Sequence, residues 1–147
     1  MKPFSFRLDS ILHYREYQEK SARNDLAVAR NEYRKTEKLV NRLAVERMEL
    51  AKRCSDEGFA GIDVPLYLMY RSLVKTLHRE LEGAHGILKK AGENVQAREM
   101  LLKRKSIERK VLEALRDLDR RRYNERREKE EQKVMDELVI IQRGRNS

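Results

Sequence analysis

The fold is decided by one short break in a helical pattern, the segment SDEGFAGIDVP at residues 55–65. Gly58 can end a helix in the left-handed conformation that glycine adopts at low cost. Asp63 or Val64 can cap a second helix, and Pro65 is tolerated in its first turn. The segment therefore predicts a helix-to-helix turn. The whole chain contains only 6 glycines and 2 prolines, so few other turns are expected.

The turn is expected at about residues 57–64, with helices at about residues 5–56 and about residues 65–141. Ser5 is placed to cap the first helix. A short loop between two helices favours an antiparallel pair. The predicted fold class is therefore all-α: a long antiparallel two-helix coiled coil, or helical hairpin, with a C-terminal helical overhang. A single coiled-coil domain is assigned to residues 1–147.

A stripe of residues before the break recurs at alternating steps of four and three. Its positions are Leu8, Leu12, Arg15, Glu19, Ala22, Leu26, Ala29, Tyr33, Thr36, Val40, Leu43, Arg47, Leu50 and Cys54. Most of them are apolar, and charge dominates the other faces, which is the pattern of a heptad seam. The first helix is therefore expected to bury this stripe against a partner helix.

The same spacing resumes after the break. Its positions are Tyr67, Tyr70, Val74, Leu77, Leu81, Ala84, Leu88, Ala91, Val95, Arg98 and Leu102. The apolar positions then shift phase, which predicts a stutter in the supercoil; they are Ile107, Val111, Leu115 and Leu118. Three glycines inside this helix either permit close helix approach or soften its middle; they are Gly83, Gly86 and Gly92.

The turn position also predicts the pairing register. Folding the chain about residue 60 places residue i opposite about residue 121 − i. Residue 6 would then lie near residue 115, and everything after about residue 116 would lack an intrachain partner.

Two stretches hold more apolar residues than one helix partner can cover. The first begins the second helix: Val64, Leu66, Tyr67, Leu68, Met69, Tyr70, Leu73, Val74 and Leu77. Either Phe59 and Ile62 fold back over it, or it is a contact patch, or both hold. The second is C-terminal: Val134, Met135, Leu138, Val139, Ile140 and Ile141. It is either a frayed, self-associating tail or, as we favour, a segment that inserts into a partner.

The formal net charge is +9, from 34 basic and 25 acidic residues. Such a charge fits a solvated surface, nucleic acid, anionic lipid or an acidic protein partner. Residues 116–133 are densely basic, but acidic residues are interspersed and no leucine heptad follows. This pattern favours a solvated helix with internal ion pairs over a nucleic-acid-binding region.

The sequence carries no motif for catalysis, a metal or a cofactor. It has no glycine-rich phosphate-binding loop. His78 and His85 lie about 10.5 Å apart along a helix, too far to share one ion. We therefore expect no enzymatic activity, no cofactor and no metal. The lone Cys54 fits a reducing compartment, and no stretch has the length of a signal peptide or membrane span. A cytoplasmic protein without direct membrane insertion is expected.

Three segments, in this order, resemble the flagellar export protein family FliJ. The first is Phe6-x-Leu8-x-x-Ile11-Leu12-x-x-Arg15. The second is Ala60-Gly61-Ile62, followed by Tyr70 and the stretch Leu73–Leu77. The third is Lys133-Val-Met-Asp136-Glu137-Leu138, with Arg143 following. Length and hairpin layout match too, so the resemblance covers essentially the whole chain.

The resemblance implies a non-enzymatic stalk of the flagellar type III export apparatus, similar to the shaft of rotary ATPases. Its paired terminal end would sit in the pore of the hexameric export ATPase and promote its assembly or activity. Its tip would face the cytoplasmic ring of the export gate protein, and export chaperones are further partners. The protein would then be peripherally associated with the inner-membrane export apparatus. The stalk of a virulence secretion system has the same architecture, but the Phe-x-Leu block favours the flagellar one.

Residues are assigned to these partners by position. The expected ATPase-binding residues are Phe6, Leu8, Leu12, Arg15, Lys133, Val134, Asp136, Glu137, Leu138 and Ile141. The expected gate-binding residues are Met69, Tyr70, Leu73 and Leu77. The next positions that match the family's gate contacts hold Glu80 and Ala84, which depart from its pattern. A homodimeric coiled-coil scaffold and a basic nucleic-acid-binding protein are the alternatives from other classes.

Overall fold

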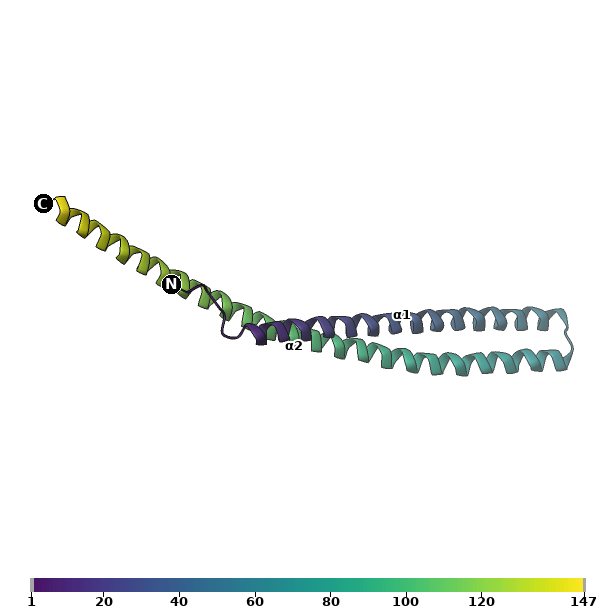
Figure 1. The fold of residues 1–147 in the computed structure, drawn as a ribbon. Coiled ribbons are helices and arrows are strands. Elements are labelled where there is room, and N and C mark those ends of the chain that lie inside the picture. The colour runs from purple at the N-terminus through teal and green to yellow at the C-terminus, as the bar shows by residue number, and fades with distance from the viewer. Residues whose placement is uncertain (1, 147) are drawn as a thin grey trace. The chain divides into compact units, whose positions relative to one another are not determined.

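The computed structural model describes residues 2–146; Met1 and Ser147, the ends of the predicted domain, lie outside the described residues. Helix α1 runs over Asp9–Ala60 and helix α2 over Val64–Asn146, joined by a short turn (Figure 1). No strand occurs between residues 2 and 146. Contacts between the two helices are those of an antiparallel pair, so the predicted all-α hairpin is confirmed.

Gly61, not Gly58, ends α1. Its φ is +87°, and its N–H lies 3.4 Å from the carbonyl oxygen of Gly58. Gly58 itself lies inside the last turn of α1, because the left-handed position that requires glycine comes three residues later. The carbonyl of Asp63 accepts a hydrogen bond of 3.0 Å from the N–H of Tyr67. Asp63 is therefore the N-cap of α2, one of the two residues that the sequence offered for this position.

The outer ends of both helices also differ from the prediction. Helix α1 begins at Asp9, because Leu8 supplies the first helical acceptor, its carbonyl, to the N–H of Leu12 at 2.9 Å. Ser5 lies before the helix and does not cap it. Helix α2 continues to Asn146, past residue 141; Arg143 and Arg145 in its last turn favour that end of a helix.

The helix pair divides into two compact units. The tip unit comprises residues 22–102, and the terminal unit comprises residues 2–21 and 103–146 of the described chain. Each contains one segment of α1 and one of α2. The two are described separately below.

The tip unit buries the seam that the heptad pattern predicts. Its core holds Val40, Leu43, Leu81 and Ala84, with Leu39, Ala44, Leu77 and Leu88 packed against it. Gly92 faces Tyr33 of α1, and a Cβ on this glycine would lie 3.4 Å from the Tyr33 ring, at van der Waals contact. A Cβ on Gly83 or Gly86 would meet nothing within 4 Å.

The register of the tip unit is shifted from the prediction by two to four residues along α2, up to about one helical turn. Arg47 lies opposite His78, Tyr33 opposite Gly92, and Asp25 opposite Arg98. The two residue numbers of each facing pair sum to between 123 and 125, whereas the predicted register gives a sum of 121. The shift follows from the turn: α1 extends to Ala60, so the chain reverses near residue 62.

The predicted stutter in the terminal unit is wrong. The inward positions of α2 continue in phase at steps of three and four: Lys105, Arg109, Leu112, Arg116, Asp119 and Tyr123 are all half-buried. The apolar residues that suggested a new seam are 41–55% exposed; they are Ile107, Val111, Leu115 and Leu118. One of these inward polar side chains, Arg109, pairs with a charged residue of α1, Glu19.

Candidate functional site

The N-terminal residues assigned to the ATPase are largely used by the helix pair itself. Phe6 is buried, and Leu12 is the one side chain of residues 2–146 with no exposed surface. Leu8 is half-buried. Their assignment to a partner stays a prediction, because packing between the helices already accounts for their burial.

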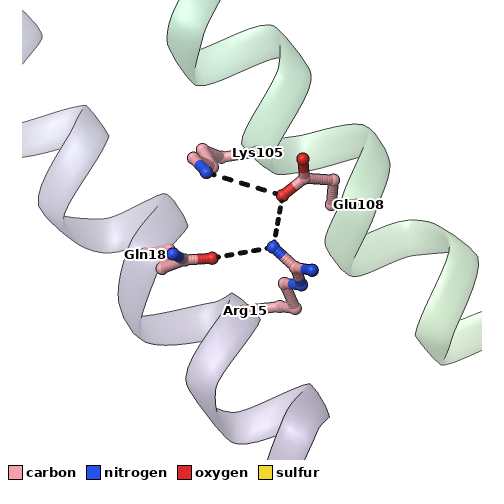
Figure 2. Close-up of polar contacts among 4 residues, drawn as sticks. All are labelled: Arg15, Gln18, Lys105 and Glu108. Carbon is pink, nitrogen blue, oxygen red and sulfur yellow. Dashed lines mark hydrogen bonds and ion pairs between the residues drawn. The ribbon is translucent and has the colours of Figure 1, made fainter.

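Arg15 lies in a polar layer between the helices (Figure 2). Its Nη1 donates to Glu108 Oε2 at 2.7 Å and to Gln18 Oε1 at 3.1 Å. Lys105 Nζ lies 3.6 Å from the same carboxylate oxygen of Glu108. Arg15 and Glu108 are about one-third exposed, so Arg15 fixes the alignment of the two helices while keeping some surface for a partner.

A second polar layer surrounds Glu19, which is only 5% exposed. Arg109 Nε donates to the Glu19 carboxylate, and Arg109 Nη1 lies 2.8 Å from Glu113 Oε2. Hydrogen bonds to Glu19 and then to Glu113 raise the pKa of Arg109. The half-buried Arg109 thus stays charged and supplies the buried Glu19 carboxylate with a partner, without which that carboxylate would be costly to bury.

The residues before α1 pack onto α2, a contact that sequence reasoning missed. The rings of Phe4 and Tyr123 have centroids 5.6 Å apart at 56°, and Arg120 Cζ lies 5.3 Å from the Phe4 ring centroid. The Tyr123 hydroxyl donates to the carbonyl of Lys2. Intrachain cover therefore extends to Tyr123, not to residue 116 as expected. The available signal was Phe4, an aromatic residue one four-residue step before Leu8, the first predicted seam position.

The C-terminal residues assigned to the ATPase remain exposed. Every described residue from 124 to 146 is exposed. Six large apolar side chains, here named the C-terminal patch, are 44–68% exposed: Val134, Met135, Leu138, Val139, Ile140 and Ile141. Asp136 accepts a hydrogen bond of 3.2 Å from Gln132 in the preceding turn. Lys133 and Glu137 are exposed as well.

The start of α2 exposes a second apolar set, here named the tip patch: Val64, Leu66, Tyr67, Leu68, Met69 and Leu73. Phe59 is itself 91% exposed and therefore does not cover it, whereas Ile62 is half-buried. Of the expected gate-binding residues, Met69 and Leu73 belong to this patch. Tyr70 and Leu77 are half-buried, and Leu77 packs against the core. A hydrogen bond with Glu57 raises the pKa of Tyr70.

No group of three or more His, Cys, Asp or Glu side chains between residues 2 and 146 could hold a metal ion. Cys54 is a buried free thiol in the α1 seam.

None of the described helices is apolar over a length that would cross a membrane.

The family model described as "Flagellar FliJ protein" matches residues 4–147. No curated protein and no solved structure matches the chain. The family match covers nearly the whole sequence, including both helices and the turn between them. The chain therefore belongs to the flagellar FliJ family and is related to flagellar protein export.

Proposed function

We propose that this chain is the central stalk of the flagellar export ATPase. The main support for this proposal is the C-terminal patch. Its large apolar side chains are about half exposed, on a helical segment with no intrachain cover. Exposed apolar groups of this size are typical of interaction sites. In the proposal, this segment enters the pore of the hexameric ATPase, beside the N-terminal residues Phe6, Leu8, Leu12 and Arg15.

The charges of the C-terminal segment suit a shaft inside a ring. Val134, Leu138 and Ile141 share one face at spacings of four and three, while Asp136 and Glu137 lie off that face. Arg126 and Arg127 lie about two turns earlier and are exposed. Mixed charge lets the segment meet basic and acidic groups around a pore. A single dry seam would instead bind it to one subunit of the ring.

The tip patch is the proposed contact with the cytoplasmic ring of the export gate. Met69 and Leu73 expose apolar surface there, and Tyr70 and Leu77 lie at its inner edge. The stalk would thus link the ATPase to the gate without chemistry of its own. We place it in the cytoplasm, peripheral to the membrane-bound apparatus, where it can also meet export chaperones.

Deleting residues 130–147 tests the ATPase contact. The truncated protein should stay helical, because its seams lie before residue 124. It should lose stimulation of the hexameric ATPase and keep its binding to the gate ring. Normal assembly with the hexamer and normal stimulation by the truncated protein would contradict the anchoring role.

A point variant makes the same test without shortening the chain. Val134→Ser with Leu138→Ser and Ile141→Ser should abolish stimulation. The matched control changes exposed apolar residues of α2 outside both patches, Ile87→Ser with Met100→Ser. The control should stimulate as the native chain does.

A further inference from the structure

A groove on one flank of the tip unit is separate from both apolar patches. It is an open hollow of about 710 Å³ between α1 and α2. Its lining residues are Ala44, Val45, Arg47, Met48, Ala51, Val74, Lys75, His78 and Arg79. Ala44 and Ala51 lie one heptad apart beside the seam of α1, and their small side chains leave the space open. All of these residues belong to the tip unit.

The groove does not overlap the proposed gate contact. On a helical wheel, His78 lies on one side of the inward residues Val74 and Leu77, and Leu73 lies on the other. Leu73 is absent from the groove lining, as is every other residue of the tip patch. The groove is therefore a second surface on the opposite flank of α2.

Basic side chains surround an apolar floor. Val45 and Met48 expose about half or more of their surface in the floor. Arg47, Lys75 and Arg79 lie at the rim, and no Asp or Glu lines the groove. None of these three cations pairs with a carboxylate of residues 2–146, whereas arginines elsewhere on the helix pair, such as Arg30, do. The rim is an uncompensated cluster of positive charge.

A histidine holds one of these cations in place. Arg47 Nη1 donates to His78 Nδ1 at 2.8 Å. His78 Nε2 lies 2.9 Å from Glu82 Oε1, outside the groove. Because the guanidinium group of an arginine can only donate, His78 Nδ1 is the acceptor. The other ring nitrogen, Nε2, can then donate its N–H to the Glu82 carboxylate. Arg47 is thus oriented by the His78 ring, and its charge stays available to a ligand.

We propose that this groove binds an amphipathic helix of a partner protein, with an apolar stripe flanked by Asp and Glu. The stripe would fill the floor, as in other helix-in-groove complexes, and the acidic flanks would meet Arg47, Lys75 and Arg79. A nucleic acid would leave the apolar floor uncovered. A second copy of this chain carries a net charge of +9, so docking its own groove against this one would set like charges together.

The test follows methionine methyl signals by NMR in the full chain labelled at those methyls. The probe is a synthetic amphipathic helix with leucines at three- and four-residue spacing and glutamates on both flanks. Met48 reports the groove, Met69 the tip patch, Met135 the C-terminal patch, and Met100 the remaining surface. As the peptide is added, the chemical shift of the Met48 methyl should change until binding is saturated. The chemical shifts of the other three methionine methyls should not change.

Charge reversal then separates the groove from general attraction to a basic protein. Lys75→Glu with Arg79→Glu should weaken binding at Met48 about tenfold or more. The matched control, Lys89→Glu with Lys90→Glu, reverses two exposed lysines outside the groove and should bind as the native chain does. Circular dichroism should show equal helicity in both variants.

Four results would overturn the proposal. They are equal binding of a peptide with lysine flanks, unchanged binding after the groove reversal, and shifts confined to Met69 or Met135. The fourth is a Met48 shift produced more strongly by a single-stranded oligonucleotide, or by raising the protein concentration alone, than by the acidic peptide.

Discussion

Arg109 of α2 donates from Nε to the carboxylate of Glu19 in α1, a side chain that is almost fully buried. The hydrogen bonds that raise the pKa of Arg109 come first from Glu19 and then from Glu113. When folding raises the pKa of a basic group, its charged form stabilises the fold. This stabilisation is complete at pH values below the pKa of the unfolded chain and is lost only above the pKa of the folded chain. The pair therefore contributes equally throughout the neutral pH range.

Breaking this pair should destabilise the helix pair. Glu19→Leu leaves Arg109 without its buried partner, so the free energy of unfolding should fall by about 1–3 kcal/mol. The double variant Glu19→Leu with Arg109→Leu should cost less than the single one, because two leucines suit a heptad seam. Urea unfolding followed by circular dichroism measures both. A double variant that is less stable than Glu19→Leu alone would show that the ion pair is not replaceable by apolar packing.

The turn gives a prediction with opposite signs at two glycines. Gly61→Ala should destabilise the fold by roughly 1–2 kcal/mol, because Gly61 has a φ of +87°. Gly58→Ala should stabilise it by up to about 1 kcal/mol, because Gly58 is helical and the nearest atom to a new Cβ is 3.6 Å away. Thermal unfolding of the two variants measures both changes. Equal effects would mean that the helix ends elsewhere.

The heptad pattern alone was enough to predict the tip unit. All the predicted seam positions of α1 in this unit, from Ala22 to Cys54, are buried or half-buried. In α2 the same holds from Tyr70 to Leu102, whereas Tyr67, the first predicted position of this seam, is exposed. Alternating three- and four-residue steps leave one face for a partner helix, so the spacing of apolar residues determines the buried side. The register could not be predicted as well, because two nearby glycines offered two ends for α1.

The terminal unit shows where apolar spacing misleads. Val111 and Leu115 suggested a new seam, yet both are exposed. The seam there is held by Glu19 with Arg109 and by Arg15 with Glu108. Charged residues normally indicate a solvated face, so ion pairs between helices could not be recognised before the register was known. Both apolar patches, in contrast, were predicted as surplus and are exposed.

His13 should show a pH response at the start of α1. Its Nδ1 lies 2.8 Å from the carbonyl of Asp9, and this hydrogen bond, followed by the charge of Asp9, raises its pKa above 6.5. The stabilisation from this contact is complete at pH values below the pKa of His13 in the unfolded chain. It is lost as the pH rises through the pKa of His13 in the folded chain. An NMR titration of His13 measures the pKa. Asp9→Asn should lower it only in part, because the backbone contribution remains. A native value at or below 6.5 would contradict the contact.

Leu73 and Leu77 should separate binding from folding at the tip. Leu73 is 45% exposed in the tip patch, whereas Leu77 packs against the core of the tip unit. Leu73→Ala should therefore leave the unfolding midpoint nearly unchanged and weaken binding to the gate ring. If Leu73 becomes fully buried there, the loss should reach about 2–3 kcal/mol. Leu77→Ala should mainly lower the stability of the fold, because it removes apolar contacts from the seam.

Binding to the export ATPase should be unaffected by Leu73→Ala, since the proposed anchor lies in the C-terminal patch. Calorimetric titration with each partner, beside thermal unfolding, measures all three quantities. Equal loss of binding to both partners with Leu73→Ala would contradict a separate tip site.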